Sequence, residues 1–333
     1  MSQKILVTGI TGFVGSHLAD FLLEKFGESI DLYGTKRYHL SRMDHVYHLQ
    51  DKVRWMDCDI TDPIASRILI ESIKPDIVFH CAAESFVSPS WDHPSRYMSV
   101  NYNGTLNLLE AIRATGCETI FHIPGSGEEY GLIYPEEVPI TETTVLRPVN
   151  PYAVTKVAQD LIGYVYNQSY GTKVIRTRAF NHEGPRREKV FGIPWYAYQI
   201  AKIELGLQEP EVRHGHLEDL RNFTHVKDMV EAYWISTQVC YPGELYLIGN
   251  DSSSELYTFR QALEGLIELS TYKTKITLIQ DEKYVRPTAV PRLVGDVSKF
   301  RKVSGWTPKI KFDQILIDTL NYWREELKRN PQR

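Results

Sequence analysis

Short hydrophobic runs alternate with longer stretches of helical periodicity through the first half of the chain. A helix is expected over about residues 14–25. Val14, Leu18 and Leu22 repeat there at the spacing that places side chains on one helical face. A second helix is expected around residues 105–114. This alternation predicts an α/β fold, a Rossmann-type doubly wound parallel sheet with helices on both faces. The expected strands are residues 5–7, 30–33, 53–56, 77–80, 119–122 and 173–177.

The alternation ends after about Phe180, and the next forty or so residues are rich in Gly, Pro, Arg and Glu. One more strand is expected at 245–248, and two helices near 259–268 and 312–328. These segments predict a smaller α/β substrate-binding lobe, with the chain crossing back to the first domain at least once. The expected division is a Rossmann domain of residues 1–180 and 222–250, and a second lobe of residues 181–221 and 251–330.

Composition excludes some classes of protein but does not indicate an activity. The 333 residues are 42% hydrophobic and 24% charged, which is close to the average for globular proteins. Because 38 basic residues face 42 acidic ones, no basic excess favours nonspecific nucleic-acid binding. No apolar run approaches the roughly 20 residues of a membrane span, and no signal-peptide pattern opens the chain. We therefore expect a soluble, cytoplasmic protein.

The cysteines give no indication of a metal or redox motif. Cys58, Cys81, Cys117 and Cys240 are widely scattered, and none forms a CxxC pair. We expect no metal site, and we expect reduced, structural cysteines.

Three glycines separate the first expected strand from the first helix. Gly9, Gly12 and Gly15 would let the backbone turn sharply and approach a pyrophosphate, while the helix N-terminus offers free N–H groups. The spacing is GxxGxxG rather than GxGxxG, and an ordinary turn could also contain three glycines. The strand before and the helix after favour dinucleotide binding.

The end of the second strand indicates which dinucleotide binds. An NAD site usually has an Asp or Glu there for the ribose 2′-hydroxyl. Here Thr35, Lys36 and Arg37 stand in its place, and such groups suit a 2′-phosphate. NADP is therefore favoured over NAD, unless the two cations are solvated loop charges. Asp59, after the third strand, is placed to accept a hydrogen bond from the adenine amino group.

Tyr152 and Lys156 form a YxxxK spacing, which puts both side chains on one helical face. A nearby lysine favours the phenolate and so lowers the tyrosine pKa, as proton transfer at a carbinol requires. An exposed lysine beside a partly buried tyrosine would show the same spacing. The upstream segment 125–131 favours the catalytic interpretation of this spacing over the structural one. Ser126 is expected to hydrogen-bond the reacting hydroxyl, and Glu128 is expected to act as a general base.

Together these motifs resemble the extended short-chain dehydrogenase/reductase family over nearly the whole chain. The resemblance is strongest to the GDP-mannose 4,6-dehydratases and the related GDP-4-keto-6-deoxymannose reductases. Arginines in 186–221 and at position 286 agree with a nucleoside diphosphate ligand, although each alone could be a surface ion-pair residue. Further matching stretches are residues 34–37, 42–47, 82–87, 180–187, 220–228, 286–290, 293–296 and 305–308.

The resemblance implies a set of binding residues beside the catalytic Ser126, Glu128, Tyr152 and Lys156. The implied cofactor contacts are Gly9, Thr11, Gly12, Phe13, Val14, Gly15, Thr35, Arg37, Asp59, Ile60, Ala82, Ala83, Tyr152, Lys156 and His182. The implied substrate contacts are Glu84, Ser85, Ser126, Asn181, Arg186, Lys189, Arg221 and Arg286. In that family the loop at 35–47 also reaches a neighbouring subunit, so we expect a homodimer or homotetramer.

As the resemblance implies, a 4,6-dehydratase runs a redox-neutral cycle on a GDP-hexose such as GDP-mannose. Tyr152 takes the 4-hydroxyl proton while NADP⁺ takes the C4 hydride. Glu128 then removes the C5 proton, the 6-hydroxyl leaves as water, and the hydride returns to C6 to give a GDP-4-keto-6-deoxy sugar. This is the main expectation for the chain.

The alternative is an NADPH-dependent GDP-4-keto-6-deoxyhexose 4-reductase, because the motifs are mixed. Residues 128–131 look like the reductases, whereas 35–47 and 181–187 look like the dehydratases. A UDP-sugar 4-epimerase is disfavoured by 181–187, and a silent NADP-binding scaffold by the complete catalytic set. The departures Glu84, Gly127 and Ala289 leave the hexose and a ribose or base contact open.

Overall fold

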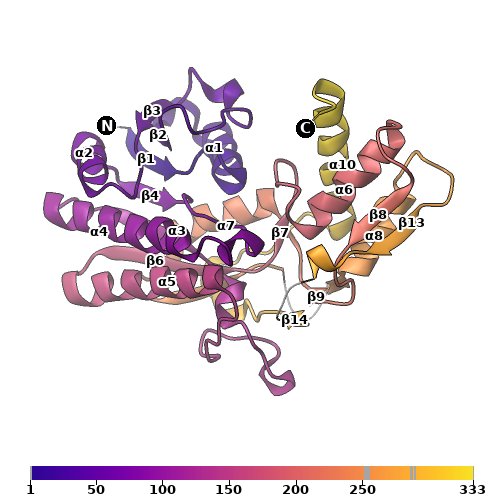
Figure 1. Cartoon of the computed structure of the whole chain (residues 1–333). Helices are drawn as coiled ribbons and strands as arrows, with labels where there is room; N and C mark the ends of the chain where they lie inside the picture. Colours follow the sequence, from indigo (N-terminus) through magenta and orange to yellow (C-terminus); the bar gives the residue numbers. More distant parts are fainter. Residues whose placement is uncertain (1, 251–255, 286–287, 289, 333) are drawn as a thin grey trace.

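A seven-stranded parallel sheet forms the centre of the larger part of the molecule (Figure 1). The computed structural model describes residues 2–250, 256–285, 288 and 290–332. The strand order is β11-β6-β5-β4-β1-β2-β3, which confirms the predicted doubly wound α/β fold. Its strands are β1 (Gln3–Thr8), β2 (Ile30–Lys36), β3 (Arg54–Asp57), β4 (Ile77–His80), β5 (Ile120–Ser126), β6 (Lys173–Ala179) and β11 (Leu245–Ile248).

Helices cover both faces of this sheet, because its strands are apolar on both sides. On one face, α1 (Phe13–Phe26) and α7 (Val226–Val239) bury Leu18 and Met229 against the sheet. The opposite face packs against Leu69 and Leu109. These belong to α2 (Pro63–Ile73) and α4 (Gly104–Thr115), beside which lies α5 (Pro151–Tyr170). The chain enters α4 through α3 (Pro94–Tyr97) and the π-helical turn η4 (Met98–Asn103).

A second group of elements has its own apolar cluster, on the right in Figure 1. Its helices are α6 (Gly192–Glu204), α8 (Phe259–Glu268) and α10 (Phe312–Arg329), and the last two match the expected helices closely. Strands β8 (Glu211–His214) and β13 (Thr277–Gln280) pair in parallel at its edge.

Short elements connect the two parts of the chain. Two small sheets have the strand orders β10-β7 and β12-β9-β14, and α9 (Ser298–Ser304) packs beside β11. The strands are β7 (His182–Glu183), β9 (Leu220–Arg221), β10 (Thr224–His225), β12 (Tyr257–Thr258) and β14 (Arg292–Leu293). The 3-10 turns are η1 (Gly27–Ser29), η2 (Tyr47–Leu49), η3 (Ser88–Ser90), η5 (Gly127–Tyr130), η6 (Pro135–Glu137) and η7 (Glu282–Tyr284).

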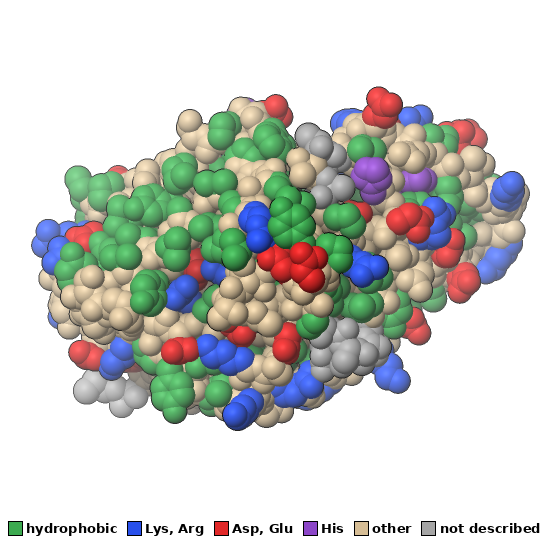
Figure 2. Space-filling view, turned by 90° about the horizontal axis from the view of Figure 1, so that it is seen from below, with side chains coloured by type: hydrophobic (Ala, Val, Ile, Leu, Met, Phe, Trp, Pro, Cys, Tyr) green, Lys and Arg blue, Asp and Glu red, His purple; other side chains and the backbone are tan. Residues whose placement is uncertain are grey.

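The surface carries charges of both signs. On the face shown in Figure 2, Lys and Arg side chains are interspersed with Asp and Glu. Among the helices that the structure describes, none is both long and apolar enough to cross a membrane.

Candidate active site

Two adjoining cavities lie where the central strands end. The first has a volume of about 530 Å³ and the second about 440 Å³. Ligands of open α/β sheets bind at this carboxyl edge of the strands. Every residue that the sequence assigns to the cofactor lines at least one of the two cavities. Gly9, Thr11, Gly12, Phe13, Val14, Gly15, Arg37, Ala83, Tyr152, Lys156 and His182 line the first, and Thr35, Asp59, Ile60 and Ala82 line the second.

The glycine loop is shaped for close approach of a ligand. Gly9 has a φ of 65°, and the Gly9 carbonyl accepts a hydrogen bond from Gly12 N–H at 3.0 Å. A Cβ at position 15 would lie 2.4 Å from that same carbonyl oxygen, so the turn requires glycine there. No side chain caps α1 and its first turn holds no acidic residue. The open N–H groups at this helix start fit a pyrophosphate.

The second cavity gathers polar groups from the ends of β2 and β3. The Thr35 hydroxyl accepts from Gly9 N–H at 3.2 Å, and Arg37 lines both cavities. Lys36 instead pairs with Asp57 at 2.6 Å. Burial raises the pKa of Asp59, but hydrogen bonds from Thr61 and the charge of Arg37 outweigh it and hold that pKa below its usual value. This cavity is therefore lined by three cations, Lys36, Arg37 and Arg96, and by two acidic residues, Asp59 and Glu84.

The catalytic candidates meet at the junction of β5, η5 and α5. Ser126 ends β5, and its hydroxyl accepts from Glu128 N–H at 3.2 Å. Asn150 caps α5 by accepting from Ala153 N–H at 2.8 Å, and its amide donates to a Glu128 carboxylate oxygen at 3.2 Å. The same asparagine thus starts the helix that carries Tyr152 and holds the proposed base beside it.

Tyr152 is buried, and the Ser126 side chain lies close enough to its hydroxyl to influence its pKa. Contrary to the expectation from the YxxxK spacing, its pKa is raised. Burial is the main cause, and the charges of Glu128 and Glu129 add to it, whereas Ser126 and Arg187 oppose it.

The hydrogen bonds of the Lys156 ammonium go to groups other than the Tyr152 hydroxyl. The ammonium donates to the Pro124 carbonyl at 2.7 Å and contacts the Gln159 amide oxygen. Burial lowers its pKa to about 8. The lysine is therefore poised to change its charge near neutral pH.

The expected substrate residues separate into groups. Ser85, Ser126, Asn181 and Arg186 line the first cavity, and Arg186 also pairs with Asp20 of α1 at 2.6 Å. Glu84 lies in the second cavity among the cofactor residues, because it pairs with Arg96 at 2.8 Å.

Two further candidates line neither cavity. Lys189 sits over the Tyr198 ring at 4.3 Å. Arg221 is buried, and its guanidinium donates to the Leu220 carbonyl at 2.8 Å. Arg286 and Ala289 lie outside the described residues. Direct binding by Lys189, Arg221 and Arg286 stays a prediction.

Arg187 is a lining residue that the sequence marks only as part of an arginine-rich segment. Its guanidinium lies 3.9 Å from the centre of the Phe191 ring and 5.2 Å from that of Phe13, and it pairs with buried Glu183 at 3.0 Å. The aromatic residue four positions further along is a signal that could have singled it out. No comparable signal marks Ser41, Cys81 and Arg96, which also line the cavities, whereas Arg42 lies in the matching stretch 42–47.

Metal and disulfide chemistry gain no support from the described residues. Within residues 2–250, 256–285, 288 and 290–332, no group of three or more His, Cys, Asp or Glu is arranged to hold a metal ion. All four cysteines are free thiols.

Relatives of the chain include both kinds of enzyme that the motifs suggest. The family model described as GDP-mannose 4,6 dehydratase matches residues 6–319. The GDP-mannose 4,6-dehydratase of Yersinia enterocolitica is 34% identical, over 94% of this chain and 91% of that protein. The GDP-6-deoxy-D-mannose reductase of Pseudomonas aeruginosa is 30% identical, over 98% of this chain and 99% of that protein.

Solved structures agree with this placement. The RMD protein of P. aeruginosa, complexed with NADPH, superposes with a TM-score of 0.80 at 27% identity, covering 98% of this chain and all of that one. The UDP-glucose 4-epimerase of Thermus thermophilus, complexed with NAD, gives 0.83 at 26% identity, with 97% and 99% coverage. The resemblance read from the motifs is thus confirmed over nearly the full length, and the chain belongs to the GDP-mannose 4,6-dehydratase family.

Proposed function

We propose that the chain is a nicotinamide-dependent GDP-hexose 4,6-dehydratase, which converts a GDP-mannose-like sugar into its 4-keto-6-deoxy form. One observation carries the proposal: Ser126, Glu128 and Tyr152 meet at the cavity that the glycine loop also lines. A carboxylate beside a tyrosine–serine pair supplies both the proton exchange at C4 and the base that elimination needs.

The residues would divide the chemistry between two carbons. When bound, the nicotinamide supplies a hydride acceptor for C4 and later a hydride donor for C6. Tyr152 takes the proton of the 4-hydroxyl, while Ser126 holds that oxygen by a hydrogen bond. Glu128, held by Asn150, removes the C5 proton made acidic by the 4-ketone and passes it to the 6-hydroxyl, which leaves as water. Arg187, which lines the cavity, is placed to neutralise a diphosphate.

A second candidate is a 4-reductase of a GDP-4-keto-6-deoxyhexose. The P. aeruginosa reductase, similar over 98% of the chain, favours it. This reaction needs only one hydride and one proton, so Glu128 would have no C5 proton to remove.

The test incubates purified protein with GDP-mannose and follows the sugar by NMR. A dehydratase forms a 4-keto product without net consumption of NADPH. A protein that leaves GDP-mannose untouched and oxidises NADPH only with the 4-keto sugar is the reductase, and the proposal fails. Glu128→Gln sharpens the assignment, because it should block water loss yet still allow C4 oxidation, seen as reduced-cofactor absorbance.

For the cofactor, we propose NADP rather than NAD. Arg37 and the Thr35 hydroxyl line the second cavity at the end of β2, where an NAD site usually has an acid. Arg37→Ala should weaken NADP binding far more than NAD binding, measured by calorimetry. Arg54→Ala, which removes an exposed partner of Asp31 outside both cavities, is the control. Equal losses for both cofactors in Arg37→Ala reject the 2′-phosphate assignment.

We further propose a homodimer or homotetramer located in the cytoplasm. Val154, Leu161, Tyr164 and Val165 leave a strip of apolar side chains on α5 more than two-fifths exposed, which a second copy would bury. Light scattering tests this, and a monomer at micromolar concentration overturns it.

We propose a division into an NADP-binding domain and a sugar-nucleotide lobe, which most of the buried apolar side chains of the two clusters support. Phe300 and Trp306 of the lobe nevertheless pack in the first cluster, and Phe223 of the domain packs in the second. The boundaries of this division are those expected from the sequence, residues 1–180 with 222–250 and residues 181–221 with 251–330.

A further inference from the structure

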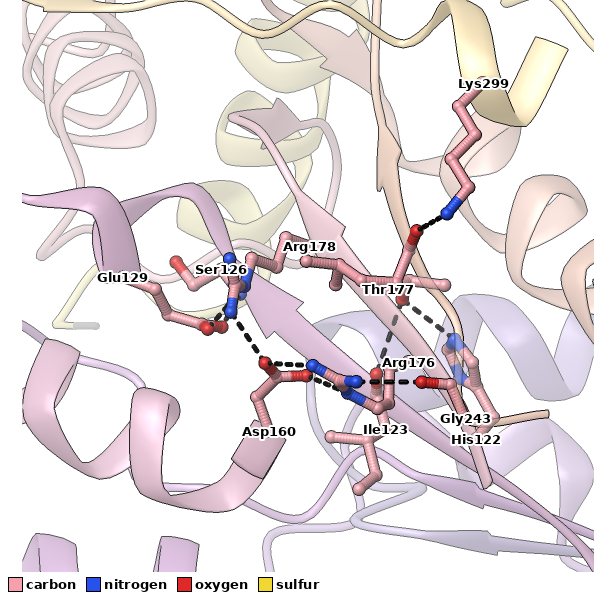
Figure 3. A network of polar contacts seen from close by, with 11 residues as sticks. His122, Ile123, Ser126, Glu129, Asp160, Arg176, Thr177, Arg178, Gly243 and Lys299 are labelled. Atoms are coloured by element: carbon pink, nitrogen blue, oxygen red, sulfur yellow. Dashed lines mark hydrogen bonds and ion pairs between the residues drawn. The ribbon is translucent and has the colours of Figure 1, made fainter. Parts of the chain in front are cut away.

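A chain of buried charges lies next to Ser126 (Figure 3). The Arg178 guanidinium of β6 contacts the Glu129 carboxylate of η5 at 2.7 Å and the Asp160 carboxylate of α5 at 2.6 Å. Asp160 also accepts from Arg176 at 2.8 Å and 2.9 Å. All four side chains are less than a tenth exposed. None of them lines either cavity, so they do not belong to the binding surface itself.

One end of this chain touches the backbone of a catalytic residue. A Glu129 carboxylate oxygen accepts from Ser126 N–H at 2.7 Å. Glycine at position 125 makes room for this contact, since a Cβ there would lie 2.6 Å from the same oxygen. The Arg178 guanidinium also lies 4.9 Å from the centre of the Tyr130 ring. The carboxylate is therefore fixed from several sides, and with it the strand end that carries the Ser126 hydroxyl.

The same carboxylate acts on Lys156. Burial lowers the pKa of this lysine, and the charges of Glu129 and Asp160 are the main influences that oppose the effect. The neighbouring His80 and His122 are buried, with pKa values lowered to about 3, so they are neutral near pH 7. The titratable groups that interact with Lys156 are Glu129 from η5, Asp160 from α5, His80 and Cys81 from β4 and its end, and His122 from β5.

We propose that Glu129, held in place by Arg178 and Asp160, is a positioning residue for the reaction, which fixes the backbone of Ser126 and supplies a negative charge for buried Lys156. The proposal rests on the proposed function, since Ser126 and Lys156 have their roles there. Stability alone gives no reason for this arrangement, because buried ion pairs are often no more stabilising than apolar residues of the same volume.

The experiment removes the charge of Glu129 and keeps its shape. In Glu129→Gln the amide oxygen still accepts from Ser126 N–H, and Arg178 keeps Asp160 as its partner. The titration of Lys156 is followed by NMR in protein labelled with ¹³C-lysine, with the signal assigned by Lys156→Arg. Loss of an opposite charge nearby should move this titration to lower pH by about one pH unit. The alkaline limb of the rate profile should move in the same direction.

A matched control is Glu204→Gln. Glu204 is also a buried carboxylate paired with an arginine, Arg324 of α10, at 2.6 Å, but it lies in the second lobe. This variant should leave the Lys156 titration where it is in the wild type.

An unchanged Lys156 titration in folded Glu129→Gln overturns the proposal. If that variant does not fold, the wild type decides. Burial raises the pKa of Glu129 to about 7, against the opposing charge of Arg178, so the Lys156 signal must show a second inflection near that pH, and a single inflection overturns the proposal. The titration needs no substrate. Failure of the wild type to convert GDP-mannose therefore rejects the proposed function without deciding this inference.

Discussion

Ion pairs of the same residue types occupy two different environments in this protein. Beside α5, the helix that carries Tyr152, Arg178 lies between Glu129 and Asp160 with almost no exposure to solvent. In the second lobe, Arg260 of α8 pairs with Glu218 at 2.6 Å, and their side chains are 45% and 70% exposed. Charges that are removed from water interact strongly and are costly to leave unpaired, whereas water screens the exposed pair.

The two regions are stabilised differently as a result. The second lobe relies on aromatic packing, with the Tyr257 and Phe312 rings stacked at 3.9 Å and Tyr198 against Trp323 at 5.2 Å. Its ion pairs lie mostly at the rim of that cluster. Under the site, in contrast, charged and titratable side chains make up part of the interior. Substitutions there should alter both chemistry and stability, and substitutions on the lobe surface should alter little.

The largest effect is expected for Tyr152→Phe, in the buried region. The ring is kept, and only the hydroxyl that we propose to exchange a proton with the 4-hydroxyl of the sugar is lost. Turnover should fall by about 10²–10⁴-fold, the usual contribution of general acid–base catalysis. Cofactor binding, measured by fluorescence, should persist. Retention of the wild-type rate would remove Tyr152 from the mechanism.

Asp160→Asn tests whether the buried charges depend on one another. Among the residues that the structure describes, it leaves Arg176 without a carboxylate partner and Arg178 paired with Glu129 alone. Breaking a buried pair by removing one partner typically costs about 3–5 kcal/mol. The free energy of unfolding should fall by this amount in urea titrations. A loss below about 1 kcal/mol would show that this region behaves like the exposed one.

The sequence predicts those parts of the site that depend on local pattern. The glycine loop, Ser126, Glu128 and Tyr152 each sit at a strand end or helix start, and a parallel sheet brings such ends to one edge. Contacts between distant segments leave no local signal. Glu129 and Arg178 are far apart in the chain and meet only because β5 pairs with β6.

The direction of a side chain is equally hard to predict. The YxxxK spacing correctly places Lys156 on a helix, but not its contact with the Pro124 carbonyl. Nor does it show that burial raises the pKa of Tyr152 more than nearby cations lower it.

The free energy of unfolding should depend on pH through buried His122, which distinguishes this region from the exposed ion pairs of the second lobe. Burial, with help from the charge of Lys156, lowers the pKa of His122 to about 3 in the folded protein. The unfolded histidine titrates near 6.5, so between these values only the unfolded state takes up the proton. The stability that comes from keeping His122 neutral in the folded protein is complete above about pH 6.5. It is lost as the pH falls, at about 1.4 kcal/mol per pH unit. His122→Gln should flatten the fall in unfolding free energy between pH 6.5 and 4.5. Identical slopes would contradict this.

The smallest effect is expected for Arg260→Ala, at the exposed pair of the second lobe. The guanidinium and the Glu218 carboxylate meet at 2.6 Å, yet both remain largely in water, and holding two long side chains together costs conformational entropy. A double-mutant cycle with Glu218→Gln should give a coupling free energy below about 1 kcal/mol, and the coupling should shrink further in high salt. Turnover should stay at the wild-type level. A coupling of about 3–5 kcal/mol, as large as the loss expected for Asp160→Asn, would mean that burial is not what separates the two regions.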